Sequence, residues 1–89
     1  SSNNVIEFLQ SLGYIRFKAD SEASSKAIYE AYLRWCEDNA QKPMSANRIS
    51  SELAQNERLY NVEATNNVYA AGKRVRGFIG VEAMNLLPY

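Results

Sequence analysis

A cluster of cations near the end of the chain is the first feature that suggests chemistry. Lys73, Arg74 and Arg76 lie within KRVRGF, residues 73–78. In an extended strand, Arg74 and Arg76 point to the same side about 6.5–7 Å apart, which is close to the phosphate spacing along one nucleic-acid strand. Phosphate contacts need charge and reach more than a defined geometry. The cluster therefore predicts phosphate contact, and the alternative is an edge strand whose charges discourage sheet-to-sheet association.

Polar side chains on a second segment, SANRISSELAQN at 45–56, can contact nucleic-acid bases. Arg48 can bond guanine through two hydrogen bonds, and Asn47 or Gln55 can do the same with adenine. Ser51 adds a hydroxyl that both donates and accepts. A solvated helix face carries the same residue types, so base recognition and simple solvation both remain open.

The residues needed for catalysis are largely missing. The chain contains no histidine, which removes the usual Ser-His and Cys-His pairs and nearly all zinc sites. It also lacks the GxxxxGK[ST] loop, so it does not hydrolyse ATP by that route. Cys36 follows Trp35 on an apolar helix face and is expected to be an inert core thiol. We expect a non-catalytic domain with no cofactor and no bound metal.

The bulk composition predicts one small folded domain spanning residues 1–89. The formal net charge is zero, but residues 42–77 hold six cations and three acids, so this segment carries +3 and the remainder −3. The single cysteine excludes an internal disulfide and favours a reducing, cytoplasmic setting. No apolar run approaches the roughly 20 residues of a membrane span. Because the chain does not begin with Met, we expect it to be a piece of a larger protein.

The spacing of apolar residues predicts the elements of the first half of the chain. Residues 4–12 place Val5, Phe8, Leu9 and Leu12 on one face, with Asn3 or Asn4 as the cap. Residues 14–18 alternate as a short strand. Residues 24–39 carry the strongest apolar stripe, which Ser24 or Ser21 can cap, and Pro43 ends this region. The stripe consists of Ile28, Ala31, Tyr32, Trp35 and Cys36.

The second half predicts a short polar helix and a hairpin. Ser45 can cap the helix at 45–56, whose inward stripe is Ala46, Ile49 and Leu53. Residues 59–83 alternate as an antiparallel hairpin with a long, mobile tip at NNVYAAG, 66–72. Tyr69 falls in this tip, where an exposed aromatic ring can contact a groove or a partner. The order helix, strand, helix, helix, hairpin predicts an α+β winged-helix fold.

Residues 28–82 resemble the C-terminal domain of phage and plasmid primase-helicases, which are related to the poxvirus primase-helicase. The matching positions are Tyr29, Tyr32, Trp35, Cys36, Pro43, Ser45, Leu53 and RGFIGV at 76–81. Such domains follow a ring-forming ATPase motor in replication proteins of mobile elements. The resemblance implies a winged-helix, DNA-binding appendage that recognises duplex DNA, such as a replication origin. Its partners are then DNA and the helicase/ATPase domain of the full-length protein, without a membrane.

The expected function is DNA binding through residues 45–56 in the major groove and the basic hairpin on the backbone. The residues expected to bind DNA are Asn47, Arg48, Ser51, Gln55, Tyr69, Lys73, Arg74 and Arg76. A protein-interaction module of a replication complex, with the same fold, is the alternative, and the zero net charge favours it. A structural spacer that binds neither partner is the third interpretation.

Overall fold

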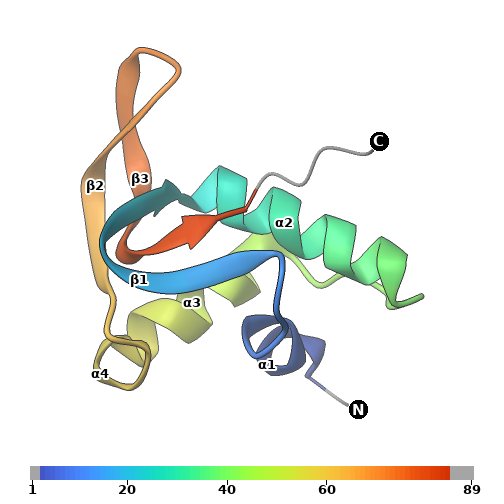
Figure 1. Ribbon diagram of the computed structural model, residues 1–89. Coiled ribbons are helices and arrows are strands. Elements are labelled where there is room, and N and C mark those ends of the chain that lie inside the picture. The colour runs from blue at the N-terminus through green and yellow to red at the C-terminus, as the bar shows by residue number, and fades with distance from the viewer. Residues whose placement is uncertain (1–2, 85–89) are drawn as a thin grey trace.

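The computed structural model describes residues 3–84, which form a mixed α+β fold (Figure 1). Helices and strands are interspersed along the chain, and the strands form one three-stranded antiparallel sheet. In order, the elements are α1 (Asn4–Leu9), β1 (Ile15–Ser24), α2 (Ser25–Asp38), α3 (Ala46–Gln55), α4 (Glu57–Tyr60), β2 (Glu63–Ala70) and β3 (Lys73–Ala83).

The sheet places β3 between β1 and β2. Phe17 of β1 pairs with Val81, and Thr65 of β2 pairs with Gly77. The β1–β3 register then shifts, because the step from Phe17 to Glu22 lies opposite the shorter step from Val81 to Ile79. The extra residues bulge outward and bend β1 sharply (Figure 1). The strand predicted at 14–18 is therefore present but continues to the start of α2.

Helix α2 forms where its apolar stripe predicts it. The Oγ atom of Ser24 accepts a hydrogen bond from the backbone N–H of Ala27 at 3.0 Å, so Ser24 rather than Ser21 is the N-cap. All five stripe residues are buried. The rings of Phe8 and Tyr32 meet edge to face at 5.3 Å, and this contact fixes α1 against α2.

The first helix is shorter than its pattern predicts. Asn3 caps it by accepting a hydrogen bond from the N–H of Val5, and the helix ends at Leu9. Leu12 is 92% exposed, so its assignment to the core face was wrong. Once the chain leaves the helix at Gln10, the i+7 position no longer returns to the buried side.

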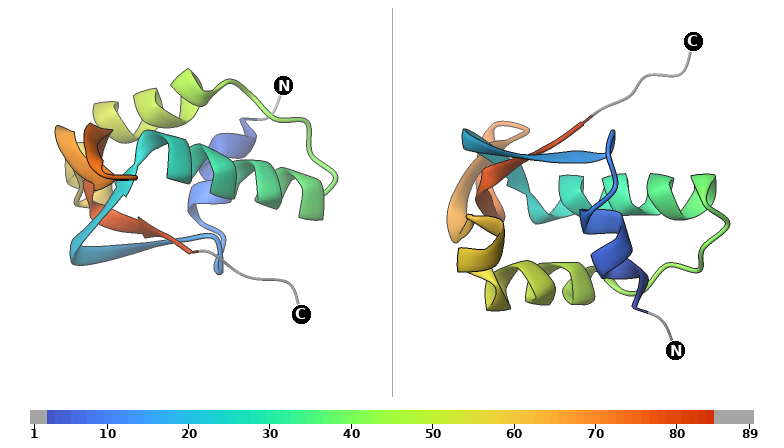
Figure 2. Two further views of the ribbon diagram at one scale, coloured as in Figure 1. Left: turned by 90° about the horizontal axis from the view of Figure 1, so that it is seen from above. Right: turned by 60° about the horizontal axis from the view of Figure 1, so that its bottom comes forward.

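A seven-residue connector, residues 39–45, leads from α2 to α3. This is longer than the three- or four-residue turn of a helix-turn-helix. Figure 2 shows that α2 and α3 run in roughly opposite directions on either side of it. The hydroxyl of Tyr29 donates to the carbonyl oxygen of Met44 at 2.9 Å, which holds the end of the connector against α2.

Helix α3 packs through a narrow side. Ile49 and Leu53 are buried, whereas Ala46, the first residue of the helix, is exposed. The polar residues cover the rest of the circumference. Since only two residues of this helix are buried, most of its surface is free for solvent or a ligand.

The hairpin differs from the prediction at both ends. Leu59 and Tyr60 belong to the short helix α4, not to a strand. The tip is a tight turn at Ala71–Gly72, whose φ angles of 52° and 79° fit a primed two-residue turn. The predicted long, mobile tip is wrong: Asn66 and Asn67 lie within β2, at a register shift against β3. Ala-Gly is a weaker signal for such a turn than Asn-Gly, so the sequence pattern missed it.

The sequence predicts a docking strand or coil at the tail EAMNLLPY, residues 82–89, and the structure describes this tail only to Met84. Glu82 and Ala83 extend β3 and pair with Arg16 and Ile15. The remainder of that prediction lies outside the described residues. The hydrophobic core lies between the sheet and the helices, and Phe78 and Val81 are its members from β3.

Candidate nucleic-acid interface

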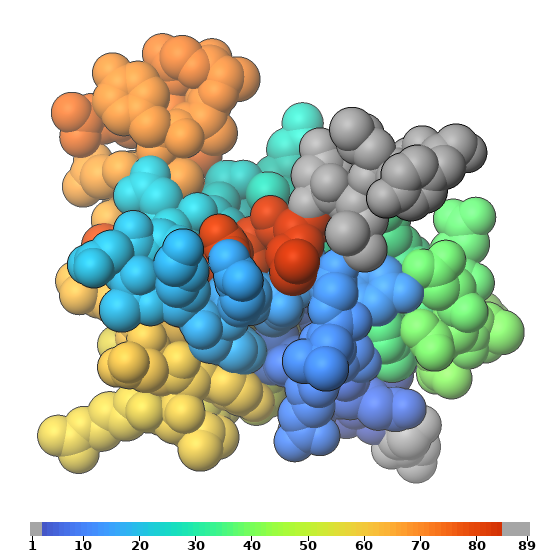
Figure 3. Space-filling model, viewed as in Figure 1, coloured from blue at the N-terminus to red at the C-terminus, as the bar shows by residue number. Residues whose placement is uncertain are grey.

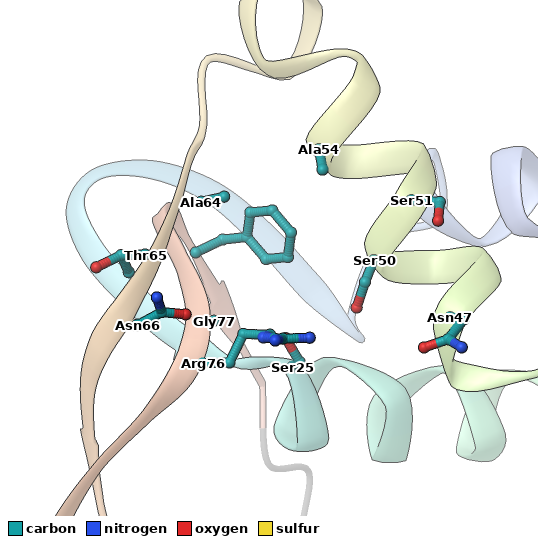
Figure 4. A pocket seen from close by; sticks show the side chains of 11 residues that line it. Ser25, Asn47, Ser50, Ser51, Ala54, Ala64, Thr65, Asn66, Arg76 and Gly77 are labelled. Carbon is teal, nitrogen blue, oxygen red and sulfur yellow. The ribbon is translucent and has the colours of Figure 1, made fainter.

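A groove of about 340 Å³ separates α3 from the hairpin (Figure 4). It is open to solvent on one side and draws its walls from both elements and from the start of α2. The lining residues are Ser25, Asn47, Ser50, Ser51, Ala54, Ala64, Thr65, Asn66, Arg76, Gly77 and Phe78. Seven of these eleven residues are polar, and they include one cation and no carboxylate.

The groove brings together three of the residues that the sequence singled out. Asn47 and Ser51 reach it from α3, and Arg76 reaches it from β3, across a separation of 25 residues in sequence. All three are exposed. Figure 4 shows the Arg76 side chain extending from β3 toward α3, with the Ser50 hydroxyl turned into the space between them.

No carboxylate in residues 3–84 neutralises the positive charge of Arg76. Within this range, Arg16 forms an ion pair with Glu82. Arg76 has no carboxylate within ion-pair distance there. An exposed guanidinium in this state presents its N–H donors to whatever enters the groove. This is the electrostatic arrangement that an anionic ligand requires.

The outer face of α3 holds the remaining residues predicted on this helix. Arg48 and Gln55 are exposed but do not line the groove. At 3.6 residues per turn, Arg48, Ser51 and Gln55 share one side of the helix, next to the side that carries Asn47. The polar face of α3 thus runs from the groove wall around to the outer surface.

A second group of predicted residues lies at the hairpin end. Tyr69 of β2 pairs with Arg74 of β3, and the guanidinium carbon of Arg74 lies 5.3 Å from the centre of the Tyr69 ring. Lys73 begins β3, directly after the turn. The prediction that Tyr69 sits in a loop was wrong, since it belongs to a strand and packs against a cation, although it is 64% exposed.

The hairpin end stands clear of the molecule, as the space-filling view shows (Figure 3). One contact joins the bent strand β1 to it: the backbone N–H of Tyr69 donates to Oε2 of Glu22 at 3.2 Å. This contact supports β2 at Tyr69, the residue that pairs with Arg74.

Sequence reasoning missed several residues of the groove. Ser50 follows Asn47 by one helical turn and could have been found from that spacing. Asn66 and Thr65 were assigned to the tip or its approach and come into the wall only through the pairing of β2 with β3. No sequence pattern indicated that Ser25 would line the groove. Its Oγ atom is buried and has no hydrogen-bond partner in the described part of the chain.

The altered pKa values belong to the core and its edges. Burial raises the pKa of the Cys36 thiol, as predicted for an inert core residue. Burial also raises the pKa of Tyr32, and burial together with the Glu52 carboxylate raises the pKa of Tyr60. These shifts disfavour ionisation of groups that support the fold.

Metal-binding clusters and membrane-spanning helices are both absent from residues 3–84. No group of three or more Asp, Glu or Cys side chains in this range is arranged to hold a metal ion. No helix in the same range has the length and apolarity needed to cross a membrane.

Comparison with known proteins gives one match. Residues 1–78 match the family model described as poxvirus D5 protein-like, which covers most of the chain. No curated protein and no solved structure matches it. The resemblance to primase-helicases inferred from residues 28–82 is thereby confirmed. The chain belongs to the poxvirus D5 protein-like family and is a domain of a primase-helicase-like protein.

Proposed function

We propose that this domain binds duplex DNA for a replication protein, with α3 in the major groove and the hairpin along the backbone. The observation that carries this proposal is the unneutralised guanidinium of Arg76 in a groove without carboxylates, beside the polar face of α3. Phosphate oxygens are the anions that such a surface meets on nucleic acid.

The order of elements supports a winged-helix fold as the frame for this function. The arrangement α1-β1-α2-α3-β2-β3 with strand order β1-β3-β2 places a hairpin next to the third helix. In winged helices this juxtaposition presents a recognition helix and a wing to one duplex. The connector at 39–45 and the extra helix α4 depart from the usual outline, and both lie away from the groove.

The residues divide by role. Asn47, Arg48, Ser51 and Gln55 on α3 face the base edges, where amide and guanidinium groups distinguish adenine and guanine. The hairpin residues Tyr69, Lys73, Arg74 and Arg76 hold the phosphate backbone. Because the cations are few, the isolated domain binds with modest affinity, and several copies on a helicase ring add avidity.

A salt titration with matched charge removal tests the proposal. The binding of a fluorescent duplex is measured by anisotropy at low and then moderate salt. We expect binding that weakens steeply with salt, and a slope of log K on log salt that falls by about 0.9 for each phosphate contact removed. The double variant Arg74→Gln, Arg76→Gln is compared with Lys18→Gln, Arg58→Gln, which removes the same charge from exposed sites on β1 and α4. Equal weakening in both variants, or no binding at low salt, would overturn DNA binding through the hairpin.

A second candidate function is protein interaction, and one surface favours it. Leu59 of α4 is 74% exposed, and beside it the rings of Tyr60 and Phe17 stack at 5.4 Å. Exposed apolar groups of this kind are typical of docking sites. Leu59→Ser separates the two functions, since it leaves the DNA titration unchanged and weakens association with a replication partner.

A further inference from the structure

We infer that the groove between α3 and the hairpin is a seat for one phosphodiester group of the DNA backbone, anchored by Arg76. This inference rests on the proposed DNA binding and assigns one contact within it. It distinguishes Arg76, which lies in a formed cavity, from Arg74, which lies against Tyr69 near the hairpin end. Arg76 therefore makes a contact at a fixed position, whereas Arg74 supplies charge.

The chemistry of the wall selects an anion. The lining combines one guanidinium with hydroxyl and amide side chains, among them Ser50, Thr65 and Asn66, which can all donate hydrogen bonds. Other surface cavities contain carboxylates: Glu30 in one and Glu57 in another. Such carboxylates repel phosphate, so the groove is distinguished by charge as well as by position.

The start of α2 also borders the groove, through Ser25. Ser25 is the first residue of this helix, where unpaired backbone N–H groups favour negative charge. Its Oγ atom is buried and has no partner within residues 3–84.

The shape of the groove favours a backbone phosphate over a nucleobase. A base needs an exposed aromatic face for stacking, but the aromatic residue of the wall, Phe78, is only 3% exposed. The volume of about 340 Å³ admits a phosphate together with part of a flanking sugar. The groove is open to solvent, as a contact with a continuous strand requires.

A methylphosphonate scan tests the seat. Single phosphates of the duplex are replaced one at a time by neutral methylphosphonates, and affinity is measured for the unaltered protein, Arg76→Gln and Arg74→Gln. We expect one position at which replacement weakens the unaltered protein and Arg74→Gln by about tenfold, the range of a charged hydrogen bond. At that same position, Arg76→Gln should lose almost nothing, because its partner is already absent.

A variant with a larger side chain in the groove separates the effect of the groove's shape from the effect of its charge. Ala54 lines the groove and is exposed on α3, so Ala54→Leu fills the space without altering charge, and Ala54→Ser is its control of near-native size. The plug should abolish the position-specific loss, while the control keeps it. Thermal unfolding curves that match the unaltered protein show that each variant is folded.

The outcomes separate this inference from the proposed function. If the unaltered protein binds duplex in a salt-dependent way but Arg76→Gln is weakened by every methylphosphonate as the unaltered protein is, the seat is wrong and DNA binding stands. If no duplex is bound at low salt, both fail. Saturable binding of inorganic phosphate that leaves duplex affinity unchanged would identify a free-anion site and overturn the backbone assignment.

Discussion

The hydroxyl of Tyr32 donates a 2.6 Å hydrogen bond to Oδ1 of Asn4. The same hydroxyl accepts a hydrogen bond from the backbone N–H of Met44 at 2.8 Å, and Nδ2 of Asn4 donates to the carbonyl oxygen of Lys42 at 3.0 Å. Both Tyr32 and Asn4 are buried. This network joins α1, α2 and the connector, and so it fixes where α3 begins.

Tyr32→Phe should lower the free energy of unfolding by about 1–3 kcal/mol, because buried polar groups of Asn4 and Met44 lose their partner. Tyr29→Phe is the matched control. It removes one partly buried hydrogen bond to the Met44 carbonyl and should cost about 0.5–1.5 kcal/mol. Urea denaturation measures both. The network is unimportant if Tyr32→Phe is as stable as the unaltered protein.

Gly77→Ala should destabilise the domain by about 3 kcal/mol or more, since an added Cβ would overlap the carbonyl oxygen of Ala23 and crowd Val68. Gly72→Ala meets no atom within 4 Å, but its φ of 79° is unfavourable for alanine and should cost about 1–2 kcal/mol. Thermal unfolding of the pair gives the test. The reverse order would show that β1 does not pack against β3 at Gly77 as described.

Stability should fall as pH rises above about 10, the ordinary pKa of tyrosine. The hydrogen bond from Tyr14 to the Asp38 carboxylate, 2.6 Å long, raises the pKa of Tyr14, and burial adds to this. The folded state therefore keeps the proton where the unfolded state releases it, so the stabilisation present below the unfolded pKa is lost as pH passes through the folded one.

Denaturant midpoints measured between neutral and alkaline pH check this expectation. Tyr14→Phe should make the alkaline decline shallower. Asp38→Asn, which removes the carboxylate that accepts the hydrogen bond from Tyr14, should also make the decline shallower. A decline that is identical in all three proteins would exclude Tyr14 as a contributor.

Arg48→Ala should relax sequence preference as well as weaken binding. A bidentate contact with guanine is worth about 1–3 kcal/mol of discrimination, so the loss should appear on preferred duplexes and be small on others. Lys73→Ala, which removes a backbone contact, should weaken all duplexes alike. Selection from a random duplex pool measures both variants. A uniform loss in Arg48→Ala would assign Arg48 to phosphate rather than to bases.

Much of the helical structure could be predicted because it is encoded locally. The stripe from Ile28 to Cys36 and the cap at Ser24 are short-range signals, and α2 forms where they predict. Leu12 shows the limit of such signals, because periodicity does not report where a helix stops. The tight Ala71–Gly72 turn was missed for a related reason, since alanine rarely adopts a positive φ.

The family resemblance was also available from the sequence, and the match over residues 1–78 confirms it. The groove could not be predicted from the sequence. Asn47, Ser25 and Arg76 are far apart in the chain and meet only after β3 has paired with its neighbours and α3 has packed through Ile49 and Leu53.

The sequence by itself determined the residue types that can bind an anion, the main helices and the absence of histidine chemistry. The tertiary structure decided which of those residues share a surface. Side-chain direction in a strand depends on register, and register depends on long-range pairing and bulges that no local pattern encodes. For that reason Arg76 and Arg74, two residues apart on β3, end in different surroundings: one in a groove beside α3, the other against the ring of Tyr69.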